Sequence, residues 1–159
     1  MNNIGLIPIN EKCKKFLILD ATDDRTSAEN LCKEFINRGY EADIDRVIYD
    51  TEFRVCRQDD FDKLQEKYDI VIFAINAEIR KWGEPMMLIW APHMFNKNKK
   101  IIVNFSSPFY ADIIFPEDPT IIDANSSANK AAIEMIADGI TGKANFEGKP
   151  AVEDIRTIK

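Results

Sequence analysis

The chain has 159 residues, of which 45% are apolar and 30% are charged, and this composition is typical of a single globular domain. Its net charge of −6 argues against a nucleic-acid partner, because phosphate binding needs a surplus of Lys and Arg on one face. No apolar run approaches the roughly 20 residues that cross a bilayer, and the three cysteines have neither a disulfide framework nor zinc-site spacing.

Strands and helices alternate along the first half of the chain. Residues 16–20, FLILD, predict a buried strand. A helix follows that begins behind Asp23 or Asp24 and ends at Gly39, with an apolar face made of Ala28, Leu31, Cys32, Phe35 and Ile36. Residues 41–50 alternate charged and apolar side chains, as an edge strand does. A short helix behind Asp59 or Asp60 then carries Phe61, Leu64 and Tyr68.

The second half continues the alternation. Residues 69–75 are apolar without a period of two, which indicates a central parallel strand covered on both faces. Residues 86–95 predict a buried helix that kinks or ends early at Pro92. Residues 99–105 and 119–125 are the fourth and fifth strands. The last helix is predicted to be capped by Ser126 or Ser127, closed by Gly139, and packed through Ala128, Ala131, Ala132, Met135 and Ile136.

These elements predict an α/β fold in three αβα layers around a doubly wound, mainly parallel sheet of five or six strands. The flavodoxin-like strand order 2-1-3-4-5 suits a charged second strand at the edge. We divide the chain into a linker-like segment (residues 1–15), one α/β sandwich domain (16–142) and an extended C-terminal tail (143–159). Two basic clusters precede strands and are interpreted as solvated loop ends: Lys12, Lys14 and Lys15, and Lys97, Lys99 and Lys100.

The carboxyl ends of the strands are polar but lack the residues of the familiar catalytic sites. A phospho-accepting receiver needs an Asp where this chain has Asn76, and two carboxylates in ATDDRTS would repel a flavin phosphate. No glycine-rich nucleotide motif is present. The single histidine, His93, lies in an apolar segment, and Ser106 and Ser107 lack a nucleophile elbow. We therefore predict no catalytic residue, no metal site and no cofactor in this chain.

Four segments together resemble the C-terminal α/β domain of glycoside hydrolase family 3, in particular its bacterial β-N-acetylglucosaminidase-like branch. GLIPINEKCKKFLILD is similar to that family's interdomain linker and first strand, and DIVIFAINAEIRKWGEP to its third strand and following loop. KKIIVNFSSPFYAD resembles its fourth strand, except that Phe109 separates Pro108 from Tyr110. AAIEMIADGITGKANFEGKPAVE resembles its closing helix and final motif, but no Leu precedes Pro150.

The resemblance implies a retaining glycosidase parent whose catalytic residues belong to a (β/α)8 barrel. This chain would then be a non-catalytic accessory domain that packs against the barrel, with carbohydrate as a further candidate partner and no membrane partner. The candidate interface or ligand residues are Arg80, Trp82, Asn76, Ser106, Ser107 and Tyr110. The turn Ser106–Ser107–Pro108 first serves to end the fourth strand, because proline cannot continue the ladder.

A different class of function is a stand-alone flavodoxin-like module that binds a small polar ligand at the strand ends, in a pocket beside Asn76 and Ser106. A large exposed apolar patch would favour the accessory domain instead. We expect the chain as given to be cytoplasmic, whereas a longer parent could be exported if a signal peptide had been removed.

Overall fold

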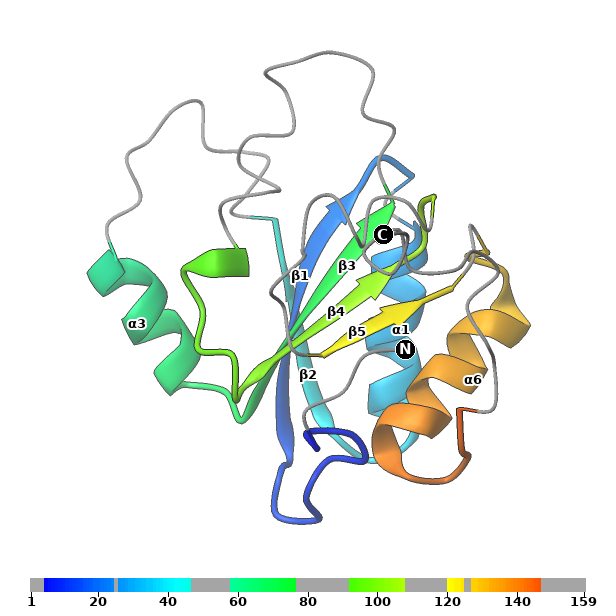
Figure 1. Cartoon of the computed structure of the whole chain (residues 1–159), viewed down its shortest axis with the longest axis horizontal. Helices are drawn as coiled ribbons and strands as arrows, with labels where there is room; N and C mark the ends of the chain where they lie inside the picture. Colours follow the sequence, from blue (N-terminus) through cyan, green and yellow to red (C-terminus); the bar gives the residue numbers. More distant parts are fainter. Residues whose placement is uncertain are drawn as a thin grey trace, which may run out of the picture.

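The computed structural model describes residues 5–24, 26–46, 58–76, 92–107, 120–124 and 127–146. Within these ranges five parallel strands form one sheet in the order β2-β1-β3-β4-β5 (Figure 1). The strands are β1 (Lys15–Thr22), β2 (Glu41–Asp45), β3 (Ile70–Asn76), β4 (Lys100–Asn104) and β5 (Ile121–Asp123). The predicted order is confirmed, and the first strand extends beyond residues 16–20 at both ends.

Helices cover both faces of the sheet. Helices α1 (Thr26–Asn37) and α6 (Lys130–Thr141) lie on one face, and α3 (Gln58–Glu66) lies on the other (Figure 1). Side chains of β1 alternate between the two cores, because successive residues of a strand point to opposite faces. Phe16 and Ile18 pack under α1 and α6, whereas Leu17 and Leu19 pack with Phe61 of α3. The predicted three-layer α/β sandwich is confirmed.

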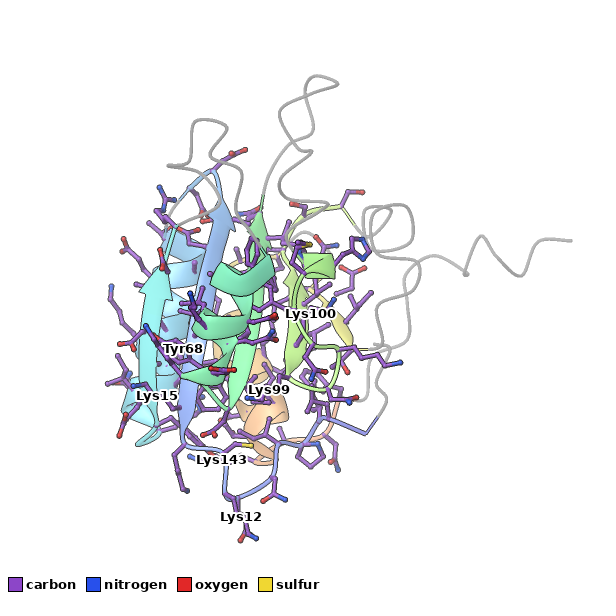
Figure 2. All side chains as sticks on the ribbon, turned by 90° about the vertical axis from the view of Figure 1, so that its left-hand side faces the viewer. Lys12, Lys15, Tyr68, Lys99, Lys100 and Lys143 are labelled. Atoms are coloured by element: carbon purple, nitrogen blue, oxygen red, sulfur yellow. The ribbon has the colours of Figure 1, made fainter. Side chains whose placement is uncertain are left out.

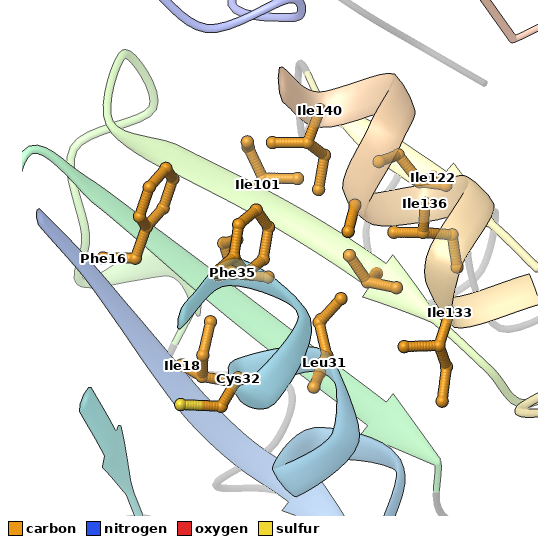
Figure 3. Packing of buried hydrophobic residues seen from close by; sticks show 14 of the residues in the cluster. Phe16, Ile18, Leu31, Cys32, Phe35, Ile101, Ile122, Ile133, Ile136 and Ile140 are labelled. Carbon is orange, nitrogen blue, oxygen red and sulfur yellow. The ribbon is translucent and has the colours of Figure 1, made fainter. Parts of the chain in front are cut away.

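The packing of α1 explains why this sequence forms a helix at this place. Leu31 and Phe35 are fully buried, and the Phe35 ring stacks on Phe16 with 4.6 Å between centroids (Figure 3). The predicted apolar face is correct except at Ile36, which is 52% exposed because it lies one residue, about 100° of helix rotation, from Phe35. The helix stops as predicted before Gly39, whose φ of 85° is a left-handed conformation.

Helix α6 differs from the prediction at both ends. Its N-cap is Asn129, whose side chain accepts a hydrogen bond from the backbone of Ala132, and neither Ser126 nor Ser127 serves as the cap. Gly139 lies inside the helix, where the Phe146 ring occupies the position that a Cβ would take. The helix ends instead at Gly142, with φ of 78°.

The buried face of α6 is also rotated from the predicted one. Ile136 is buried as predicted, with Ile133 and Ile140 beside it in the core (Figure 3), and Ala128 packs against this core. Of the other predicted residues, Ala131 is exposed and Met135 is 59% exposed. The prediction relied on alanines, which fit on either face of a helix because their side chains are small, and so it placed the apolar face about one residue away from the buried one. The isoleucines repeat at i, i+3 and i+7 and were the better signal.

Residues 5–9, in the segment predicted to be linker-like, contact the same core. Ile7 and Ile9 are buried in the cluster under α1 and α6. The backbone N–H of Ile9 donates to the carbonyl of Ile140 on α6, at 2.9 Å. Residues 143–146 follow α6, and Phe146 also packs against this core. Both ends of the described chain therefore contribute apolar surface to one side of the sheet.

On the α3 side three expectations need correction. Asp59 and Asp60 lie inside α3, which begins at Gln58, and Tyr68 lies beyond its end. Lys100 is not solvated: it is 3% exposed, and its Nζ donates to the carbonyl of Pro92 at 2.7 Å. The ammonium group is buried because Lys100 is the first residue of β4 and its stem lies within the sandwich, where a carbonyl at hydrogen-bonding distance replaces water.

The edge strand β2 is tied to the α3 side through Tyr68. The Tyr68 hydroxyl donates to Asp43 Oδ2 at 2.9 Å, and Lys15 Nζ lies 5.3 Å from the Tyr68 ring centroid (Figure 2). Burial and the Asp43 carboxylate together raise the pKa of Tyr68 to about 12. Both causes oppose the phenolate, which would lose solvation and repel the carboxylate.

We expect Tyr68 to ionise well above the ordinary tyrosine pKa of about 10. Because its folded pKa is raised above the unfolded value, its stabilising effect is complete below about pH 10 and disappears as the pH rises toward 12. The difference between the tyrosinate absorbance titrations of the native chain and Tyr68→Phe isolates this group. Tyr40→Phe is the control, and a Tyr68 midpoint near 10 would contradict the hydrogen bond to Asp43.

Candidate functional site

The strands are parallel, so their carboxyl ends meet at one edge of the sheet, and ligands of such folds bind there. We call this the carboxyl edge: residues 20–24, 45–46, 75–76, 104–107 and 123–124. Three predicted site residues, Asn76, Ser106 and Ser107, lie on it. The other three, Arg80, Trp82 and Tyr110, lie outside the described residues.

Asn76 fastens the segment between β1 and α1. Its side-chain Nδ2 donates to Asp24 Oδ2 at 3.0 Å and lies 3.3 Å from Ser27 Oγ. The backbone carbonyl of Asn76 accepts a hydrogen bond from the backbone N–H of Asp23 at 2.9 Å. Asp24 also accepts from the backbone and hydroxyl of Ser27, which confirms its predicted role as the helix cap. Asn76 thus forms hydrogen bonds within the protein at the carboxyl ends of β1 and β3, where ligands of this strand order bind.

These hydrogen bonds determine how Asp24 titrates. Partial burial by itself raises the pKa of Asp24, but the hydrogen bonds from Ser27, Thr22 and Asn76 outweigh it, so the pKa lies below the ordinary value. A carboxylate with a lowered folded pKa stabilises the protein above its unfolded pKa, and this contribution disappears as the pH falls through the folded value.

We therefore expect Asp24→Asn to flatten the pH dependence of unfolding. The free energy of unfolding of the native chain should fall from about pH 5 toward pH 3 more steeply than that of the variant. Urea titrations at several pH values measure both slopes. Asp23→Asn, at an exposed neighbouring residue, is the control, and equal slopes for native chain and Asp24→Asn would contradict the assignment.

A second cluster, which the sequence reasoning did not identify, joins β1 to the end of β2. Asp20 is 1% exposed, and its carboxylate accepts from the hydroxyl and the backbone N–H of Thr22 at 2.6 and 2.9 Å. Arg46 donates to the other carboxylate oxygen through Nε, and its Nη2 reaches the Thr22 carbonyl at 3.1 Å. The parallel register pairs Leu19 with Asp45 and so brings Asp20 beside Arg46. In the sequence, this pair could be predicted only from an acid and an arginine that each follow directly on paired residues, Leu19 and Asp45.

A third cluster surrounds the end of β4. Asn104 is fully buried, and its Oδ1 accepts from the backbone N–H of Ser106 while its Nδ2 donates to the carbonyl of Ser107, both at 3.0 Å. Ser106 is 7% exposed and Ser107 is half-buried. Ser106 therefore has little surface for a ligand, and Pro108 of the predicted turn lies outside the described residues.

Among the described residues, no group of three or more His, Cys, Asp or Glu side chains could hold a metal ion. His93 is exposed, and no described contact joins it to Ser106 or Ser107. No helix in the described ranges has the length and apolar character needed to span a membrane.

Comparisons with solved structures find a similar fold in parts of larger proteins. No family model matches the chain, and no curated protein matches it. The fold is similar to part of β-glucoside phosphorylase BglX, with a TM-score of 0.67 and 18% identity over 99% of this chain and 30% of that chain. The same enzyme bound to 2FGlc gives a TM-score of 0.63 at 18% identity, covering 94% and 28%.

A third structure, described as a GCN5-related glucosamine N-acetyltransferase region in a fungal multi-domain GH3 β-N-acetylglucosaminidase, gives a TM-score of 0.62 at 13% identity. That match covers 89% of this chain and 16% of the other. At these identities the likeness establishes a shared fold. The chain spans less than a third of the length of each of these proteins.

Proposed function

We propose that this chain is the non-catalytic α/β accessory domain of a family 3 glycoside hydrolase and packs against a (β/α)8 catalytic barrel. One observation carries the proposal: nearly the whole chain superposes on less than a third of an enzyme that acts on β-glucosides. The third structure is described as an N-acetyltransferase region in a fungal multi-domain GH3 β-N-acetylglucosaminidase, and GH3 is also the family that the four sequence segments resemble.

The geometry of the described carboxyl edge favours a protein-docking surface rather than a pocket for a small ligand. The side chains of Asp20, Asp24, Asn76 and Asn104 all bond to nearby protein groups. Two carboxylates, Asp23 and Asp24, stand where a phosphate-binding loop would need donors. A small-ligand module needs convergent polar groups that are open to the ligand. Because these four side chains of the described edge already bond within the protein, this part of the edge favours the accessory role.

The finer assignments belong to the proposal as well. We assign the parent to the N-acetylhexosaminidase type on the sequence segments, with carbohydrate as the substrate of the barrel. Arg80, Trp82 and Tyr110 are the proposed contact residues, together with Asn76 and Ser107, because arginine and aromatic side chains are frequent anchors of interfaces.

The first test is the size of the natural protein that carries this sequence. An immunoblot of the source cells with antibody against the chain should show a band several times larger than 18.2 kDa. A single band at 18.2 kDa would overturn the accessory role and favour the stand-alone ligand-binding module.

The second test is activity. The purified 159-residue chain should release no product from nitrophenyl β-N-acetylglucosaminide or nitrophenyl β-glucoside, with or without inorganic phosphate, whereas the natural parent should act on one of them. In the parent, Arg80→Ala with Trp82→Ala should raise KM or weaken domain contact. Turnover by the isolated chain would overturn the proposal, and a parent that hydrolyses only the β-glucoside would overturn the N-acetylhexosaminidase assignment.

A further inference from the structure

Asn104 occupies an unusual position for a polar side chain. It ends β4, whose residues Ile101, Ile102 and Val103 are all fully buried, and it is fully buried itself. Burying an amide is costly unless its donor and acceptor both find partners. The partners of the Asn104 side chain are the backbones of Ser106 and Ser107, with Asp123 Oδ1 at 3.5 Å on β5. All of them belong to the carboxyl edge, so the amide organises the edge and not the core.

The contacts of the Asn104 side chain with the two serines are made to their backbones. Ser106 is 7% exposed and Ser107 is half-buried, which limits the surface that either offers to a partner. The Asn104 side chain bonds to the backbone N–H of Ser106 and the backbone carbonyl of Ser107. The backbone carbonyl of Asn104 accepts a hydrogen bond from the backbone N–H of Ala124 at 2.9 Å. One residue therefore links the chain leaving β4 with the chain leaving β5.

We propose that Asn104 is the positioning residue of the surface through which this domain meets its barrel. The inference rests on the proposed function, since it takes the chain that leaves β4 to belong to the contact surface. Asn104 does not touch the partner in this account. It sets the direction of the backbone at Ser106 and Ser107, and a preorganised backbone binds better because less ordering remains to be done on contact.

Three variants separate this role from a general loss of stability. Asn104→Ala removes both hydrogen bonds to the serines. Asn104→Asp keeps the acceptor for the Ser106 N–H, but loses the donor to the Ser107 carbonyl and places a carboxylate near Asp123. Ile70→Val is the matched control, because Ile70 is buried at the opposite end of β3 and the change also weakens the core.

The first measurement is amide hydrogen exchange of the 159-residue chain alone. We expect the Ser106 amide to exchange about tenfold faster in Asn104→Ala than in Ile70→Val, and to keep its protection in Asn104→Asp. Equal protection of Ser106 in Asn104→Ala and Ile70→Val would overturn the inference. Should the buried carboxylate prevent folding, Asn104→Ala alone decides the result.

The second measurement is the affinity of the chain for the barrel portion of its own parent, expressed separately, by titration calorimetry. Both Asn104 variants should bind about tenfold more weakly than the native chain, and Ile70→Val should bind as the native chain does. Native affinity in Asn104→Ala would overturn the positioning role while leaving the proposed function intact. A native chain that does not bind the barrel overturns the proposed function and the docking role of Asn104 with it, whatever the exchange of Ser106 shows.

Discussion

Replacing Phe35 by Ala should cost about 3–5 kcal/mol of the free energy of unfolding, the range for truncating a fully buried aromatic residue. The Phe35 side chain is 0% exposed, stacks on the Phe16 ring and meets the Tyr40 ring edge-on, with ring centroids 4.6 and 6.3 Å away. Its loss leaves a cavity between α1 and the sheet, and the surrounding backbone can close such a cavity only in part. The total free energy of unfolding of a natural domain is only about 5–15 kcal/mol, so the variant should be close to unfolding.

The neighbouring residue supplies the control for this prediction. Ile36→Ala changes the same helix by a similar volume, but Ile36 is 52% exposed and the change should stay within about 0.5 kcal/mol. Urea unfolding at constant m-value measures both. Phe35→Leu, which fills part of the cavity, keeps the comparison possible if Phe35→Ala does not fold. Similar losses for Phe35→Ala and Ile36→Ala would mean that α1 presents a different face to the sheet.

The predictable part of this fold is the part that periodicity controls. Unbroken apolar runs identify the central strands β3 and β4, and the charged residues of β2 place it at the edge. The helix face of α1 follows from its i, i+3, i+4 spacing. These signals are local in sequence, and they decide which side of each element loses contact with water.

The features that the sequence did not reveal depend on contacts between distant segments. Gly139 was predicted to end the last helix because nothing near it in the sequence shows that Phe146 packs against it. Ile7 and Ile9 were not predicted to be buried because two apolar residues are too few to show a helix or strand period. The Asp20–Arg46 pair requires the register of β1 against β2, which no short window contains. At the candidate site, Asn76, Ser106 and Ser107 could be proposed because they are polar residues at predicted strand ends. Asn104 could not, because it stands one residue inside the predicted strand 99–105.

The second large loss of stability is expected when the Asp20–Arg46 pair is broken, because the Asp20 carboxylate is almost completely buried. Arg46→Ala should destabilise the chain by about 3 kcal/mol, since removing one partner leaves the Asp20 charge in the sandwich without its counter-ion. The Asp20→Asn change removes that charge and keeps an acceptor for Thr22. The double variant should therefore recover to within about 1 kcal/mol of the native chain.

The double-mutant cycle separates this mechanism from a plain loss of packing at Arg46, whose side chain is 23% exposed. If the guanidinium acts by compensating Asp20, Arg46→Ala costs far less in the Asp20→Asn background than in the native one. Arg46→Lys is the matched charge control and should fall between native and Ala, because an ammonium group cannot hold both Asp20 and the Thr22 carbonyl as the guanidinium does. An Arg46→Ala cost that is the same in both backgrounds would show that Asp20 does not need Arg46. The carboxyl ends of β1 and β2 would then owe their arrangement to the β-ladder alone.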